Sequence, residues 1–199
     1  MAETIAGRTC EGCAMCCKLL SIDELAKPRL EWCPHCAGRR RCDIYSQRPA
    51  PCAAFRCGYL TQSILDDVWK PSRSKLIVTF EPESNRVVVH VDPARPDAWR
   101  REPYYSAIRR WGRNSARDRS QVIVWQGDLA IAVLPDREKA LGTVRPEQLI
   151  LTSRREGPAG PVIDVFAVDP DHPMAIKLQQ PCGTPNSRMH RGGATAGST

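Results

Sequence analysis

The chain has 199 residues and a formal net charge of +7, with 42% hydrophobic and 26% charged residues, which is ordinary for a soluble globular protein of one or two small domains. Its longest apolar stretch, residues 129–134, is far too short to span a bilayer, and residues 1–6 lack the features of a secretory signal. We therefore expect a cytoplasmic protein with no membrane association. Thiols stay reduced there, so dense cysteines are typical of metal ligands or catalytic groups rather than disulfides.

The first third of the chain holds nine of the ten cysteines and is predicted to contain little regular structure. Ser21 and Glu24 form a capping-box pattern, which predicts a brief helix that stops before Pro28. A loop-rich stretch follows. The apolar spacing over residues 57–69 then predicts a helix with one buried face, ended by Pro71.

After residue 71 the pattern changes to runs rich in β-branched residues. These predict two hairpins, one over residues 75–91 and one over residues 121–134, with a helix over residues 103–113 between them. Further short strands are expected near residues 140–144, 148–151 and 162–168.

The predicted fold class is therefore α+β. A loop-rich cysteine metal-binding module with short helices spans residues 1–70. A small antiparallel β-rich half with one main helix spans residues 71–180. Residues 181–199 are polar, and we expect them to form a disordered tail.

The first four cysteines are Cys10, Cys13, Cys16 and Cys17, a C-x2-C-x2-C run followed at once by a fourth cysteine. Three cysteines at this spacing are typical of a cubane iron–sulfur cluster, whereas zinc sites normally use two C-x2-C pairs far apart in sequence. The run lacks the C-x3-C-P ending of bacterial ferredoxins. The side chains of adjacent Cys16 and Cys17 should diverge, so both would bind metal only if the local backbone is bent or two metals lie nearby. The alternative is that one of them is a buried core thiol.

Five more cysteines follow within the same third of the chain. Cys33 and Cys36 form another C-x2-C pair, and Cys42, Cys52 and Cys57 form a looser group. Nine thiols exceed one four-ligand site and can supply two. The sequence therefore predicts that all nine are metal ligands, of iron–sulfur or of zinc.

Residues 42–55 read Cys-Asp-Ile-Tyr-Ser-Gln-Arg-Pro-Ala-Pro-Cys-Ala-Ala-Phe, and they follow the CxxCxxCC run of residues 10–17. These two motifs, in this order, resemble the CxxCxxCC-type proteins, a family described as zinc- or iron-chelating. The second family motif is C-x-I-Y-x-x-R-P-x-x-C-R-x-F, and Ala53 departs from it by replacing the usual arginine. The resemblance implies six ligands: Cys10, Cys13, Cys16, Cys17, Cys42 and Cys52. It says less about Cys33, Cys36 and Cys57.

Several other residues have two interpretations. Arg48 would hydrogen-bond thiolates or backbone carbonyls and offset negative charge, while Ile44, Tyr45 and Phe55 would form an apolar shell or simply a small core. For His35, between the second pair of cysteines, we favour a solvated loop residue over a metal ligand.

A basic run surrounds the helix predicted over residues 103–113. It contains arginines at positions 100, 101, 109, 110, 113, 117 and 119. Contact with RNA is one interpretation, but we favour a solvated basic face opposite a packed aromatic stripe. No acid–base pair or phosphate-cradling glycine motif is identifiable.

The leading hypothesis is a metal-binding protein that holds an iron–sulfur cluster or zinc through thiolates in residues 10–57, in a structural or electron-transferring role. One alternative is a zinc-stabilised adaptor whose basic C-terminal half binds nucleic acid or a protein partner not identified by the sequence. Another is a metal-dependent enzyme of undefined reaction.

Overall fold

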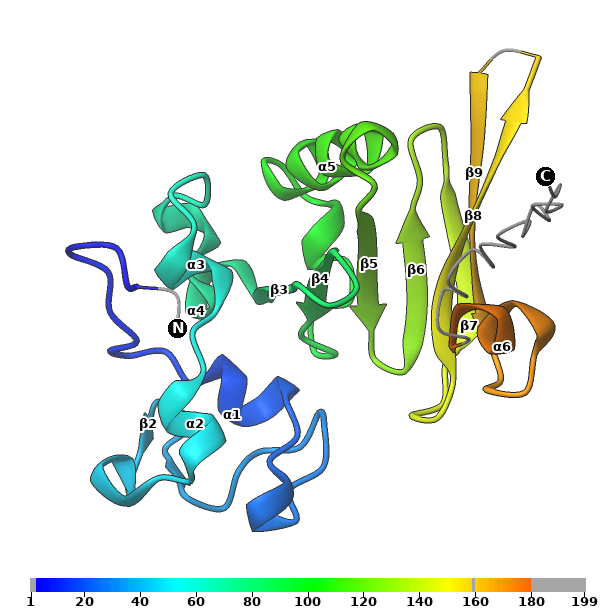
Figure 1. The fold of residues 1–199 in the computed structure, drawn as a ribbon. Helices are drawn as coiled ribbons and strands as arrows, with labels where there is room; N and C mark the ends of the chain where they lie inside the picture. The colour runs from blue at the N-terminus through cyan, green and yellow to red at the C-terminus, as the bar shows by residue number, and fades with distance from the viewer. Residues whose placement is uncertain (1–2, 159, 180–199) are drawn as a thin grey trace, which may run out of the picture.

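A mixed five-stranded sheet lies at the centre of the protein in the computed structural model, which describes residues 3–158 and 160–179 (Figure 1). Its strand order follows the sequence, β3-β4-β5-β6-β7. The strands are Leu76–Glu81, Arg86–Val91, Gln121–Gln126, Leu129–Val133 and Glu138–Thr143. Both predicted hairpins are confirmed: β3 pairs with β4 and β5 pairs with β6, each antiparallel.

One strand pair departs from the expected antiparallel arrangement. β4 and β5 are parallel, with His90 opposite Trp125. A parallel pair needs a crossover connection, and helix α5, Tyr104–Asp118, lies within it. The predicted main helix is therefore confirmed and extends further than expected, and it returns the chain to the end of the sheet where β4 began.

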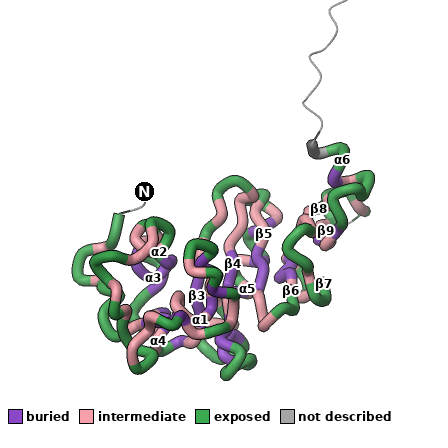
Figure 2. Tube along the Cα trace, turned by 90° about the horizontal axis from the view of Figure 1, so that it is seen from below, coloured by how far each residue is buried: buried purple, intermediate pink, exposed green. Residues whose placement is uncertain are grey.

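Helix α5 covers one face of the sheet with an apolar stripe. Ile108 is fully buried, and Gly112 lies so close to β6 that any added Cβ would meet the Val133 backbone. The cluster on this face also takes in residues that precede the sheet, Leu65 and Trp69. Figure 2 shows buried residues concentrated along β3, β4 and β5.

The opposite face of the sheet is partly covered by the last described elements. These are the long hairpin of β8, Leu149–Gly157, and β9, Gly160–Val168, followed by α6, Pro173–Gln179. Ile150 and Val165 of this hairpin pack in one cluster with Ile123. The predicted late strands are confirmed, whereas α6 was not predicted. Within the described residues, no helix is long and apolar enough to cross a membrane.

The cysteine-rich segment lies at the β3 edge of the sheet and consists of short elements (Figure 1). Its helices and strands are α1 Met15–Leu19, β1 Cys36–Ala37, β2 Arg41–Cys42, α2 Ala50–Ala54 and α3 Gly58–Thr61, and α4, Pro71–Ser74, connects the segment to β3. Single 3-10 turns occur at Asp23–Leu25, Tyr45–Gln47, Asp67–Trp69 and, beyond β4, Ala98–Arg100.

This segment shares its core with the sheet across residue 70. Met15 and Leu19 of α1 pack in one cluster with Ile77 of β3. Lys18 of α1 also forms an ion pair with Asp92, just after β4, at 2.6 Å between Nζ and Oδ1. The cysteine-rich segment is therefore held against β3 and β4 by apolar packing and by one largely buried ion pair.

Two local predictions for the cysteine-rich segment are wrong. Ser21 caps no helix: the 3-10 turn Asp23–Leu25 starts from Ile22 without a side-chain cap. The helix predicted over residues 57–69 is broken into α3 and a later 3-10 turn, because the Asp66 carboxylate accepts a hydrogen bond from the Val68 N–H and starts that turn separately. The predicted tail, residues 181–199, lies outside the described residues.

Pro71 does not end a helix as expected. It occupies the first turn of α4, where its fixed φ suits a helix start and its missing N–H costs nothing.

Candidate metal centre

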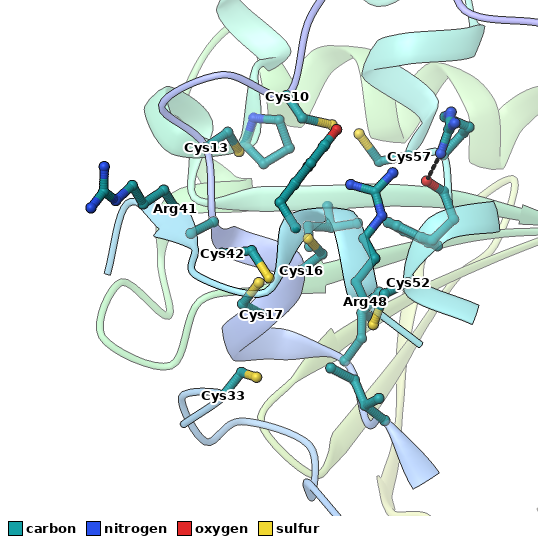
Figure 3. Close-up of a pocket in the computed structure, with 18 of the residues that line it drawn as sticks. Cys10, Cys13, Cys16, Cys17, Cys33, Arg41, Cys42, Arg48, Cys52 and Cys57 are labelled. Carbon is teal, nitrogen blue, oxygen red and sulfur yellow. Dashed lines mark hydrogen bonds between the residues drawn. The ribbon is translucent and has the colours of Figure 1, made fainter. Parts of the chain in front are cut away.

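Eight of the nine described cysteines line one cavity of about 710 Å³ (Figure 3). They are Cys10, Cys13, Cys16, Cys17, Cys33, Cys42, Cys52 and Cys57. None of the described cysteines forms a disulfide. The fold therefore brings thiols from as far apart in the sequence as Cys10 and Cys57, 47 positions, to the same cavity.

The ninth described cysteine, Cys36, is adjacent to this set. It pairs directly with Cys42 across the small β1–β2 ladder, and its thiol lies within hydrogen-bonding reach of Cys17. All nine predicted ligands are thus in or next to the cavity, including Cys33, Cys36 and Cys57.

Both C-x2-C pairs form tight hydrogen-bonded turns. The Cys13 N–H donates to the Cys10 carbonyl at 2.9 Å, and the Cys36 N–H donates to the Cys33 carbonyl at 3.0 Å. Gly12 makes the first turn with a φ of +68°, which a residue with a Cβ rarely adopts. A third hydrogen bond, 2.9 Å from the Cys33 N–H to the Cys17 carbonyl, joins the two turns through α1.

The thiols of Cys16 and Cys17 lie within hydrogen-bonding reach of each other, although adjacent side chains were expected to diverge. Cys17 donates to Cys16, which lowers the pKa of the Cys16 thiol to about 7 against the opposing effect of burial. The same hydrogen bond, followed by burial, raises the pKa of Cys17. Of the two thiols, Cys16 is therefore the one that ionises first.

The remaining shifted thiols are held in the protonated form. Burial raises the pKa of Cys57 to about 11. Burial is also the largest cause of the raised pKa values of Cys10, Cys36 and Cys52, and the negative charges of neighbouring cysteines add to it. A metal ion that binds here must displace these protons, so metal affinity must rise with pH.

Lys27 is a buried cation beside these thiols that the sequence did not point to. The residue as a whole is only 4% exposed, and two backbone hydrogen bonds with Ile22 fix its position. Its ammonium donates to the carbonyls of Lys18, at 3.0 Å, and Leu20, at the end of α1. Within the described residues it has no carboxylate partner.

The strongest favourable charges acting on the Lys27 ammonium come from thiols. Burial is the largest influence on Lys27 and lowers its pKa, but negative charge on Cys17, Cys33 and Cys16 opposes this shift. Buried charges are normally paired, and Cys16, whose pKa the Lys27 charge helps to lower, is the thiol that can serve as the anionic counterpart of Lys27. No sequence signal marked Lys27, because its burial depends on the Ile22 bridge.

Arg48 lines the cavity but does not bond to backbone carbonyls as one interpretation expected. Its guanidinium stacks on the Tyr45 ring, 3.8 Å from the ring centre. Ile44 and Phe55 also line the cavity, as the apolar-shell interpretation expected, whereas Tyr45 is 59% exposed and stands at its open side. His35 does not line the cavity.

The thiols line the same cavity, but they are not close enough together to coordinate a single metal ion. Over residues 3–158 and 160–179, no three Cys, His, Asp or Glu side chains form a group that would hold one metal ion. Tetrahedral zinc with sulfur ligands at about 2.3 Å needs its sulfurs roughly 3.8 Å apart. Binding a single ion would therefore require the cysteine-bearing loops to draw closer together.

The chain was compared with protein-family models, curated proteins and solved structures. No protein-family model matches it, and neither the curated proteins nor the solved structures contain a match. The resemblance to the CxxCxxCC-type family therefore stays a prediction from the two motifs.

Proposed function

We propose that residues 10–57 bind an iron–sulfur cluster through cysteine thiolates. The observation that carries this proposal is the convergence of eight cysteines on one cavity. A structural single-ion zinc site and a cubane each use four thiolates, so eight converging thiols are enough for two such centres of either kind. In a cubane each thiolate binds a different iron, which suits thiols that surround a cavity rather than meet at a point.

The charges around the cavity also support an anionic metal centre. Lys27 is buried beside Cys16, Cys17 and Cys33 without a carboxylate partner among the described residues. A buried ammonium and nearby thiolates stabilise each other. The ammonium therefore favours the deprotonated form of the cysteines, which is the form that binds metal. The cluster would be held in a reducing compartment, for which we propose the cytoplasm.

Zinc is the second candidate, favoured by a specific local feature. The turns Cys10–Cys13 and Cys33–Cys36 are both closed by hydrogen bonds between their end residues. Paired C-x2-C turns of this kind are typical of structural zinc sites. In that case four thiols would hold zinc, and the other cysteines would pack as small apolar residues.

Anaerobic purification followed by iron, zinc and acid-labile sulfide analysis distinguishes these candidates. We expect brown protein with iron and sulfide in similar amounts and absorption near about 400 nm. Colourless protein with stoichiometric zinc and no sulfide would replace the iron–sulfur proposal with the zinc one. Protein without either metal, before and after anaerobic reconstitution, would overturn both.

A further inference from the structure

The wall of the thiol cavity carries a strong excess of positive charge. Five arginines line it, at positions 8, 40, 41, 48 and 56, against a single carboxylate, Glu11. Two of these arginines donate hydrogen bonds to backbone carbonyls. Arg8 donates to Tyr59 at 2.6 Å and to Gln62 at 2.9 Å, and Arg56 donates to Ala53 and Phe55 at 2.8 Å each.

Arg48 is held in place but keeps its hydrogen-bond donors free. It stacks on Tyr45 at 3.8 Å, and its side chain makes no hydrogen bond or ion pair within the described residues. Figure 3 shows it extending into the cavity toward Cys10 and Cys57. Arg40, on the exposed β1–β2 turn, likewise has no side-chain partner in the part of the chain that the structure describes.

Arg48 is not the main counter-charge of any one thiol. Lys27 lies beside Cys16 and Cys33, and Arg56 favours the Cys10 thiolate more than Arg48 does. The exposed Tyr45 beneath the Arg48 guanidinium shows that this side of the cavity is reached by solvent. A preorganised guanidinium with free donors, at the open side of a hollow, is suited to bidentate capture of an oxyanion.

We propose that the mouth of this cavity binds a small anionic ligand, a molecule with a phosphate or carboxylate group, with Arg48 as its main donor and Arg40 as a second. The apolar wall residues Ile44, Pro49 and Phe55 would contact the uncharged part of such a ligand. This inference goes beyond metal binding, because it places a ligand beside the thiols rather than among them.

Titration calorimetry of the full chain, purified anaerobically, tests the proposal with inorganic phosphate and with acetate as separate probes. Chloride at equal ionic strength is the reference. We expect saturable binding of at least one probe and a ten- to hundredfold weakening in Arg48→Gln, since a hydrogen bond to a charged group contributes about 1.5–3 kcal/mol. The probe that binds more tightly identifies the oxyanion class.

Arg110→Gln is the matched control, because Arg110 is exposed on α5 and does not line the cavity. It should bind the probes like the unmodified protein. If Arg48→Gln does not fold, Arg48→Lys and Arg40→Gln replace it, and each should still weaken binding severalfold.

Three results would overturn the proposal. The first is the absence of saturable binding above the chloride reference, and the second is unchanged affinity in the Arg48 and Arg40 variants. The third is a loss of metal from Arg48→Gln with anion affinity unchanged, which would assign Arg48 to charge compensation. Metal content is measured in the same samples. If the protein contains no metal but still binds the anion through Arg48, the anion-site proposal stands and the metal proposal fails.

Discussion

The cysteine-rich segment and the central sheet obtain their order from different sources. The sheet residues are joined by continuous ladders of paired strands and pack in apolar clusters, with Val89 and Val124 of the sheet and Ile108 of α5 fully buried. The cysteine-rich segment has helices of five residues or fewer and strands of two, and many of its buried or half-buried side chains are thiols. This contrast teaches that strand pairing and apolar burial order the sheet, whereas the cysteine-rich segment has little regular structure of its own, and we propose that bound metal adds to its order.

The largest expected effect is loss of the metal. Cys13→Ser and Cys52→Ser should each lose bound metal and make residues 1–70 accessible to hydrogen exchange, while the sheet amides stay protected. Metal analysis and exchange mass spectrometry measure both effects. Cys182→Ser, at a position outside the described residues, serves as the control and should keep its metal. Unchanged metal content in both variants would refute the ligand assignment.

Replacing Lys27 should produce the next largest effect. Lys27→Met removes the buried positive charge beside the thiolates and leaves two carbonyls of the α1 end unsatisfied, at about 1–3 kcal/mol each. We expect at least a tenfold loss of metal affinity in competition with a chelator. Lys27→Arg keeps the charge and should recover part of that affinity. Equal losses in both variants would show that side-chain shape, and not charge, is what matters.

His90 should make the sheet sensitive to acid. Burial, with Arg29 nearby, lowers its pKa from 6.5 to about 4, and its buried Nδ1 has no hydrogen-bond partner among the residues that the structure describes. Because the unfolded chain binds this proton more readily, the free energy of unfolding should fall as the pH drops from about 6.5 to 4, by roughly 3 kcal/mol in total. Urea titrations of metal-free protein and of His90→Gln measure this. Parallel pH profiles for the two proteins would rule the effect out.

A smaller loss is expected where α5 approaches β6. In Gly112→Ala the new Cβ would lie 2.8 Å from the Val133 carbonyl oxygen, so the helix must shift. We expect the free energy of unfolding to fall by about 1–3 kcal/mol with metal content unchanged. Denaturant unfolding and metal analysis of the same sample provide the measurement. A concurrent loss of metal would show that the two regions are more strongly coupled than their shared core suggests.

The smallest effect concerns the exposed basic face of α5. Neutralising Arg110, Arg113 and Arg117 together should leave the metal content unchanged. The free energy of unfolding should change by no more than about 0.5 kcal/mol, because all three side chains are exposed. RNA binding at moderate salt is measured on the same proteins. Binding by the unmodified chain that the triple variant loses would instead favour the adaptor hypothesis.

Some features of this protein were determined by the sequence alone because they depend on near neighbours in the chain. The runs 86–91 and 121–125 follow the period of a strand, and the aromatic spacing around Ile108 follows that of a helix, so hairpins and α5 were predictable. The helix predicted over residues 57–69 failed because the local Asp66 cap competes with a continuous apolar pattern.

Other features were decided by tertiary structure. The parallel pairing of β4 with β5 depends on where the crossover returns the chain, and the burial of Lys27 depends on its bridge to Ile22. The gathering of Cys10 and Cys57 at one cavity depends on α1 and α3 packing against β3. Spacing along a chain specifies which thiols share a turn. Only the packing of distant segments can specify which turns face the same cavity, because that choice is made by apolar contacts between residues far apart in the chain.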